Sequence, residues 1–200
     1  MFEDDSPYDQ LRSVLQGWLE LPQTQWLQLR SLFQLKTIRK HEHIIYPGTK
    51  NYPILFVYSG LLRTYYLSED GIEKNKSFAV EDTIGGPISA FVLGLPVVYG
   101  VQALEPSTLL LAQYDDFAAL FDQHPVFDRL GRKIAEQTMI RKELRERSFL
   151  LNDAKKRYLD FLKRNPDLVQ RLAQYHIASY LGVSEVSLSR LKRALTQKIS

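Results

Sequence analysis

Apolar residues near the start of the chain recur at three- and four-residue intervals, the spacing of one face of an α-helix. They form two groups, at positions 15–19 and 26–33, and Pro22 lies between them. Proline lacks the amide hydrogen that a helix needs, and its ring clashes with the preceding turn. The pattern therefore predicts helical structure from Leu11 to Leu35, interrupted at Pro22.

The pattern changes to that of β-strands near Thr37. Stretches such as YPILFVYSGLLRTYYL (52–67) are rich in β-branched and aromatic residues, and further strand-like segments follow at Val97–Leu104 and Thr108–Tyr114. Turn signals that contain glycine separate these segments at positions 59–60, 69–71 and 85–87. Short strands at this spacing predict a sandwich or barrel-like roll rather than a parallel sheet.

Helical periodicity returns after Tyr114. DDFAALFDQHP (115–125) predicts a short helix, and a long helix is expected from Val126 to Leu151. Within the long helix Leu130, Gln137, Leu144 and Leu151 repeat every seven residues, with Ile134 between the first two. This stripe resembles an imperfect coiled coil, which Gln137 and Arg141 interrupt. We interpret Leu130, Ile134, Gln137 and Leu144 as a dimer seam; the alternative is a helix packed on its own roll.

The remaining chain, from residue 152 to 200, is helical in pattern and is broken at Asn165 and Pro166. Three units are therefore expected: residues 1–125, 126–151 and 152–200. Together they predict an α+β fold class, with the strands confined to the first unit.

Composition limits the function classes. The chain has no cysteine, which excludes disulfides, thiolate zinc sites and cysteine-bound iron–sulfur clusters. No apolar window approaches the roughly 20 residues needed to span a bilayer, and MFEDDSPYDQ at the start does not have the pattern of a signal peptide. We therefore expect a soluble cytoplasmic protein that has no contact with membranes.

The net charge of +3 conceals a division between the two parts of the chain. Residues 1–128 carry 9 Lys and Arg against 16 Asp and Glu, whereas residues 129–200 carry 17 against 7. A basic C-terminal part favours a polyanionic partner. The alternative is that these cations simply solvate helix faces.

The segment IASYLGVSEVSLSRLKRAL (177–195) has the pattern of a DNA-binding helix-turn-helix. Ala178 is the small residue that two steeply crossing helices need at their contact, and Gly182 suits the turn. Ser184 is a natural N-cap for the second helix. Leu188 is spaced to fill the seam between the helices. An ordinary helical hairpin is the alternative.

The second helix of this motif has distinct inner and outer faces. At 3.6 residues per turn, Leu188, Leu191 and Leu195 share one face. The opposite face presents Val186, Ser189, Arg190 and Arg193. Arginine can read guanine in the major groove, and an apolar side chain can contact the thymine methyl group. The predicted DNA-binding set is Gln174, Ser184, Glu185, Val186, Ser187, Ser189, Arg190, Lys192 and Arg193, of which Gln174, Ser184 and Lys192 are expected to contact phosphates.

Nearly the whole chain resembles the Crp/Fnr family of regulators, the relatives of the cyclic-AMP receptor protein and the fumarate–nitrate regulator. TIGGPISAFVLGLPVVYGVQALEPS (83–107), RERSFLLNDAKKRYLDFL (145–162) and HIASYLGVSEVSLSRLKRAL (176–195) carry the likeness. The resemblance implies a homodimeric transcription regulator with a cyclic-nucleotide-binding-like jelly roll (a double-stranded β-helix), a dimerising helix and a C-terminal winged helix. It also implies double-stranded DNA with a pseudo-palindromic operator and RNA polymerase as partners.

The sequence departs from that family at the ligand site. Members that bind cyclic nucleotide have a Gly-Glu pair and, further on, an Arg-Ser or Arg-Ala pair; the matching positions here are Gly85-Gly86 and Val97-Val98. A buried phosphate without a paired cation is strongly disfavoured. We therefore expect no cyclic-AMP binding of the usual kind and no cofactor. Gly85, Gly86, Ser89, Val97 and Val98 remain the candidate contacts for an unidentified effector.

Two further differences concern the C-terminal part of the chain. Glu185 and Val186 replace the first two residues of the family's base-reading pattern, and only Arg190 is retained. We therefore do not expect this protein to bind the operator that the cyclic-AMP receptor protein reads. The final TQKIS leaves few residues for a wing, so we expect the wing to be shortened or supplied from upstream.

Two other function classes stay open. HEH at positions 41–43 places two imidazoles on one side of a strand, as a cupin-type metal enzyme would need. No carboxylate follows at a suitable distance, and no phosphate loop or Gly-x-Ser-x-Gly motif is present, so neither a metal site nor enzymatic activity is expected. The other alternative is a ligand-sensing module that signals to protein partners.

Overall fold

The computed structural model describes residues 5–50 and 52–196. Two short helices, α1 (Ser6–Gln16) and α2 (Gln23–Leu32), open the chain. Pro22 separates the two helices, as predicted, and is the N-cap of α2. The helical structure stops three residues before Leu35, because residues 34–38 pair with another strand instead.

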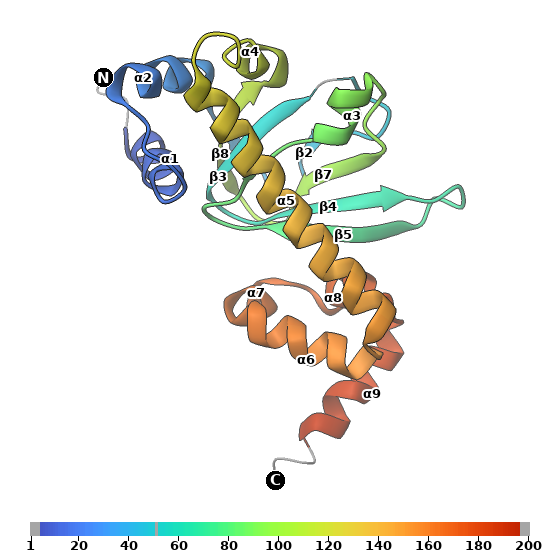
Figure 1. Ribbon diagram of the computed structural model, residues 1–200. Helices are drawn as coiled ribbons and strands as arrows, with labels where there is room; N and C mark the ends of the chain where they lie inside the picture. Colours follow the sequence, from blue (N-terminus) through green and yellow to red (C-terminus); the bar gives the residue numbers. More distant parts are fainter. Residues whose placement is uncertain (1–4, 51, 197–200) are drawn as a thin grey trace.

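Among the residues that the structure describes, eight strands form two antiparallel four-stranded sheets that face each other in a β-roll (Figure 1). This confirms the predicted roll and the mixed fold class. One sheet has the order β1 (Gln34–Ile38), β8 (Ser107–Gln113), β3 (Pro53–Ser59) and β6 (Ile84–Gly85). The other has the order β2 (His43–Ile45), β7 (Tyr99–Ala103), β4 (Leu62–Leu67) and β5 (Glu73–Ala79).

Apolar side chains from both sheets fill the inside of the roll. Val57 and Leu109 come from one sheet, and Leu62 and Ala103 come from the other. Each is buried almost completely, and burying one large apolar side chain stabilises a fold by roughly 1.5–3 kcal/mol. Two short helices, α3 (Ile88–Leu93) and α4 (Tyr114–Ala118), follow β6 and β8.

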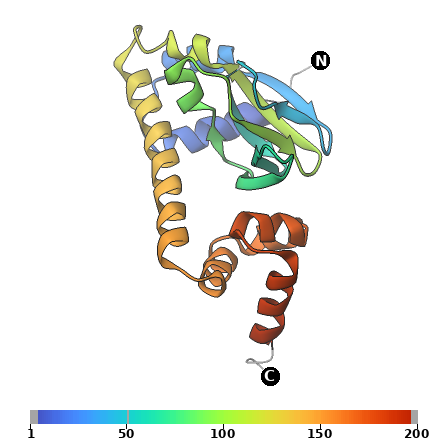
Figure 2. The same ribbon diagram turned by 90° about the vertical axis from the view of Figure 1, so that its right-hand side faces the viewer.

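The long helix α5 (Pro125–Leu151) runs past the roll and leads to the C-terminal helices (Figures 1 and 2). It begins at His124, whose Nδ1 accepts a hydrogen bond from the Val126 amide at 3.1 Å. Its first half packs against the N-terminal helices in one apolar core.

The burial of this first half changes the predicted dimer seam. Leu130 is 0% exposed and Ile134 is 4% exposed, because the N-terminal core of the same chain covers them. Neither side chain has surface to offer a partner. Gln137 and Leu144, further along the helix, keep exposed surface. Leu130 and Ile134 therefore cannot form the predicted seam, whereas the exposed surface of Gln137 and Leu144 is compatible with it.

Four helices complete the described chain: α6 (Ala154–Arg164), α7 (Pro166–Arg171), α8 (Gln174–Leu181) and α9 (Glu185–Thr196). Asp153 caps α6 by accepting a hydrogen bond from the Lys156 amide at 2.7 Å. No strand follows β8 among residues 5–50 and 52–196, so the wing of the predicted winged helix is missing from this part. Residues 197–200, on which the expectation of a shortened wing partly depends, lie outside the described range.

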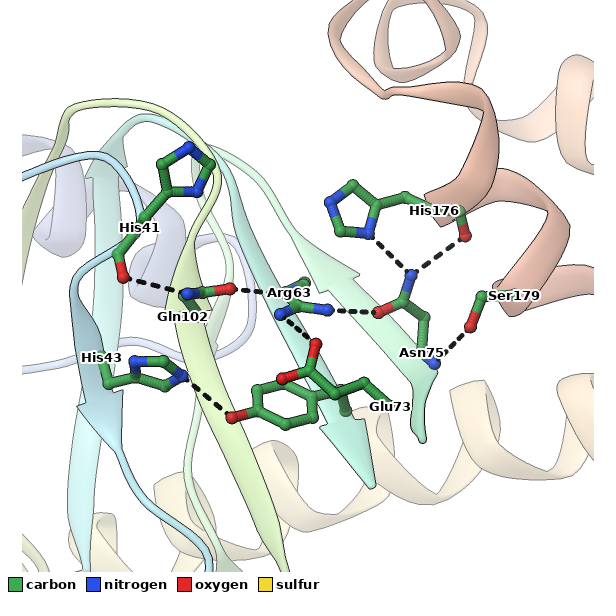
Figure 3. Close-up of polar contacts among 9 residues, drawn as sticks. His41, His43, Arg63, Glu73, Asn75, Gln102, His176 and Ser179 are labelled. Carbon is green, nitrogen blue, oxygen red and sulfur yellow. Dashed lines mark hydrogen bonds and ion pairs between the residues drawn. The ribbon is translucent and has the colours of Figure 1, made fainter. Parts of the chain in front are cut away.

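Helix α8 packs on β5, and this contact joins the C-terminal helices to the roll (Figure 3). Asn75 is central to it. Its amide nitrogen lies 3.0 Å from both Nδ1 and the carbonyl oxygen of His176, and its backbone N–H donates to Ser179 Oγ at 2.9 Å. An apolar cluster beside these bonds includes Leu61 and Leu104 of the roll together with residues of α6 to α9.

Ion pairs between Arg171 of α7 and two glutamates of the roll form a second contact between the C-terminal helices and the roll. The Arg171 guanidinium donates to Glu81 at 2.9 and 3.0 Å and to Glu105. Glu81 also accepts a hydrogen bond from the Gly60 amide at 2.8 Å. These hydrogen bonds lower the pKa of Glu81 to about 2, and the bond from Arg171 makes the largest contribution.

Among the described residues, no helix is both long enough and apolar enough to cross a bilayer.

The Arg171–Glu81 pair predicts a pH-dependent contribution to stability. Because the pKa of Glu81 is lower in the folded chain than the ordinary value of 4.5, ionised Glu81 stabilises the fold above about pH 4.5. That contribution is lost as the pH falls towards 2. We expect Arg171→Ala to lower the free energy of unfolding by about 1–2 kcal/mol at pH 7, a figure reduced for the partial exposure of the pair. Urea unfolding at pH 7 and pH 2.5 measures the effect.

A control for this prediction is Arg132→Ala, which removes the exposed pair with Glu136. An exposed pair of this kind contributes less than about 0.5 kcal/mol. An equal loss from Arg171→Ala at both pH values would contradict the account, because it would not depend on the ionisation of Glu81.

Candidate nucleic-acid interface

A sharp turn between α8 and α9 sets the angle at which the two helices meet. Gly182 adopts a left-handed conformation with a φ of 68°, which favours glycine over residues with a side chain. Its N–H closes the last turn of α8, and the Val183 N–H bonds to the Ala178 carbonyl at 3.0 Å. A Cβ at position 182 would also lie only 2.9 Å from the Phe149 ring. The turn therefore requires glycine, as predicted.

Ser184 caps the start of α9. Its Oγ accepts a hydrogen bond from the Ser187 amide at 3.1 Å and lies 2.9 Å from Ser187 Oγ. The cap satisfies an amide that would otherwise lack a partner in the first turn. Glu185 follows as the first residue of the helix and is exposed.

Apolar side chains fill the seam between the two helices. Ala178 and Leu181 of α8 are buried, and Leu188 of α9 is 1% exposed. Leu191 and Leu195 lie half-buried on the same side of α9. This is the inner face that the 3.6-residue period predicts.

Helix α9 lies at the end of the molecule that is far from the roll (Figures 1 and 2), and its opposite face is exposed. Val186 is 60% exposed, and Ser189, Arg190 and Arg193 are exposed beside it. Within the described part of the chain, neither arginine forms an ion pair. The face thus combines two unpaired guanidinium groups, a hydroxyl and an apolar side chain, which is a combination that suits base edges in a major groove.

The remaining members of the predicted set lie around this face. Gln174 and Ser187 are exposed, and Lys192 is half-buried. Tyr175, which the sequence pattern did not single out, is 50% exposed beside Gln174 at the start of α8.

The predicted ligand segment, residues 85–98, has no lysine or arginine. Gly85 and Gly86 line a cleft, and a Cβ on Gly86 would lie 2.9 Å from the Pro53 carbonyl oxygen. Val97 is fully buried in the core of the roll. Ser89 and Val98 are exposed, and neither lines that cleft. The structure thus brings only the two glycines of this set to the cleft.

The two histidines of the HEH segment do not form the pair that a metal site would need. His41 lies in a turn with a φ of 68°, and only His43 belongs to β2. His43 Nε2 lies 2.9 Å from the Tyr65 hydroxyl (Figure 3). Within the described ranges, no group of three His, Asp or Glu residues could hold a metal ion.

Comparisons with known proteins agree with this fold. Residues 35–124 match the cyclic nucleotide-binding domain. No curated protein matches the sequence.

Solved structures with a similar fold include three regulators of the Crp/Fnr family. FixK2 from Bradyrhizobium japonicum has a TM-score of 0.70 at 18% identity, covering 83% of this chain and 85% of its own. A CooA mutant from Carboxydothermus hydrogenoformans has a TM-score of 0.68 at 18% identity, covering 85% and 79%. The catabolite activator protein of Thermus thermophilus has a TM-score of 0.56 at 20% identity, covering 92% and 87%.

The cap of α9 predicts a measurable loss of stability. Replacing Ser184 with alanine leaves the Ser187 amide without its partner, and loss of such a cap costs about 1 kcal/mol. Chemical unfolding followed by circular dichroism measures this loss. Ser189→Ala, on the exposed face of the same helix, is the matched control and should change stability by less than about 0.5 kcal/mol. Equal effects of the two substitutions would show that the cap does not stabilise the helix.

Proposed function

We propose that the protein is a homodimeric, sequence-specific DNA-binding transcription regulator of the Crp/Fnr type. The observation that carries the proposal is the outer face of α9, where Val186, Ser189, Arg190 and Arg193 are exposed. An exposed valine between arginines does not stabilise a solvated helix. It can, however, contact the methyl group of a thymine in the major groove.

Helices α8 and α9 form the helix-turn-helix of this proposal. Arg190 reads guanine in bidentate fashion, and Val186 and Ser189 lie against neighbouring base edges. Gln174, Ser184 and Lys192 contact phosphates, which position the protein without reading sequence. Glu185, Ser187 and Arg193 border the same groove.

Two copies would pair through α5. Gln137, Ile140, Leu144 and Leu151 recur at three-, four- and seven-residue intervals on one side of the helix. Ile140, Leu144 and Leu151 are 45%, 38% and 75% exposed, so this side is apolar and uncovered in the single chain. It replaces Leu130 and Ile134 in the predicted seam and retains Gln137 and Leu144.

The three predicted units fit this function. Residues 1–125 form the effector domain, 126–151 the dimerisation helix and 152–200 the DNA-binding domain. A dimer would place two α9 helices about 34 Å apart, one turn of the duplex, on a pseudo-palindromic site. The similarity of the fold to CooA, FixK2 and the catabolite activator protein supports this arrangement of units. RNA polymerase is the further partner in this proposal. The lack of a histidine pair at positions 41–43 disfavours the cupin alternative.

We predict that Arg190→Ala weakens binding to the preferred duplex by about 1–3 kcal/mol and changes binding to random duplex little. The reason is that a bidentate arginine distinguishes guanine from other bases. Fluorescence anisotropy with both duplexes at several salt concentrations measures the effect, and log K should fall steeply with log salt for the unsubstituted protein. Arg39→Ala, an exposed arginine of the roll, is the control. Equal losses on both duplexes would mean that Arg190 only contacts phosphate.

We predict that Ile140→Asp together with Leu144→Asp converts the dimer to a monomer, because two buried charges would face each other across the seam. The operator affinity would then fall at least about tenfold, since each chain would bind a single half-site. Sedimentation equilibrium measures the mass. Met139→Asp is the control, because Met139 is 61% exposed but lies off the stripe. A double variant that kept the mass of a dimer would place the interface elsewhere.

A further inference from the structure

A cleft of about 860 Å³ lies between the roll, α5 and the C-terminal helices. This volume falls in the range of small-molecule binding sites. Strands β4, β5 and β7 form one wall, with Tyr66 and Tyr99 among its side chains, and α5, α6 and α8 form the other. Of the predicted ligand segment, only Gly85 and Gly86 line it, so most of the cleft is formed by other residues.

The charges that line the cleft are unbalanced. Six Lys and Arg residues face two acidic residues, Glu146 and Asp160. The cations are Lys76, Arg141, Lys142, Arg145, Arg157 and Arg164. Among the described residues, none of these six forms an ion pair. Unpaired cations gathered in a cleft favour an anionic ligand.

Lys76 is the most confined of these cations. Its Nζ lies 3.9 Å from the centre of the Tyr99 ring and 5.3 Å from that of Tyr66. Burial, with Lys142 and Arg145 nearby, lowers the pKa of Lys76 to about 8. An anion placed between these three residues would relieve their mutual repulsion.

Helix α5 supplies three of the other cations, and α6 supplies Arg157 and Arg164. Arg141 and Lys142 come three and four residues after Thr138, Arg145 comes four residues after Arg141, and Phe149 comes four residues after Arg145; all five line the cleft. Of the stripe proposed for dimerisation, Gln137, Ile140 and Leu151 do not line the cleft, whereas Leu144 does. The cations proposed to hold the ligand are not part of that stripe.

We propose that this cleft binds a phosphorylated small molecule with at least two negative charges, held by Lys76, Lys142 and Arg145. The segment 85–98 has no cation, so the phosphate groups bind at the β5–α5 side instead. The tyrosines and phenylalanines of the cleft leave room beside the cations for an organic part of the ligand. The site does not depend on the proposed DNA binding.

Arg145 connects this site to the contact between α8 and β5. Its guanidinium donates to the Tyr180 carbonyl at 3.1 Å and to the Asn75 carbonyl at 3.3 Å, and it lies 4.2 Å from the centre of the Tyr180 ring. A bound anion competes with these carbonyls for the guanidinium. The orientation of α9 would then depend on the ligand if the two arrangements bind the anion with different affinity.

Isothermal titration calorimetry without DNA tests the site, with inorganic pyrophosphate and adenosine 5′-diphosphate as multiply charged probes and cyclic AMP as a singly charged one. We expect the two multiply charged probes to bind and cyclic AMP to bind at least about tenfold more weakly. Lys76→Met, which keeps the stem against the tyrosines, and Lys142→Gln, at an exposed position, should each weaken binding about tenfold. The affinity should also fall as the pH rises through about 8, where Lys76 loses its charge.

Two controls separate this site from other cations of the chain. Lys74→Met changes an exposed lysine of the same strand that does not line the cleft. Arg190→Ala with Arg193→Ala removes the proposed DNA contacts. Both should leave probe binding unchanged. The proposal is overturned if neither multiply charged probe binds, or if cyclic AMP binds more tightly than both of them. It is also overturned if probe binding survives Lys76→Met and Lys142→Gln, or if Arg190→Ala with Arg193→Ala abolishes probe binding.

Discussion

The position of α9 depends on the buried contact between Asn75 of β5 and His176 of α8. Asn75 is 3% exposed, and an amide so buried must have its hydrogen bonds satisfied. Its oxygen faces Arg63, which can only donate, so its nitrogen is turned towards His176. Burial lowers the pKa of His176 to about 4, and the neutral ring therefore accepts this bond at neutral pH. With α8 fixed in this way, the Gly182 turn directs α9 away from the roll.

The periodicity of α9 was sufficient to predict which of its side chains are buried. Leu188 packs inward and Val186 is exposed because α9 packs against α8, its neighbour in the sequence. The same reasoning failed for the first half of α5. Leu130 and Ile134 belong to an apolar cluster that also contains residues of α1, α2 and the roll, and the periodicity of α5 alone holds no information about that packing.

The cations of the cleft could not be predicted for a related reason. Lys74 and Lys76 look alike in the sequence, yet only Lys76 lines the cleft. The pairing of β4 with β5 shifts register between Thr64 and Tyr65, so strict alternation of faces does not hold along β5. The cleft also joins Lys76 to Lys142 and Arg145, which are far away in sequence and become neighbours only when α5 packs beside the roll.

The central claim is that α9 reads a duplex as one of two symmetry-related copies. Selection of bound sequences from a pool of random duplexes tests it most directly. The account predicts an enriched inverted repeat whose half-sites are centred about 10–10.5 base pairs apart, with a conserved guanine in each half. A pool that shows no enriched sequence after repeated rounds, although the protein is folded, would contradict it.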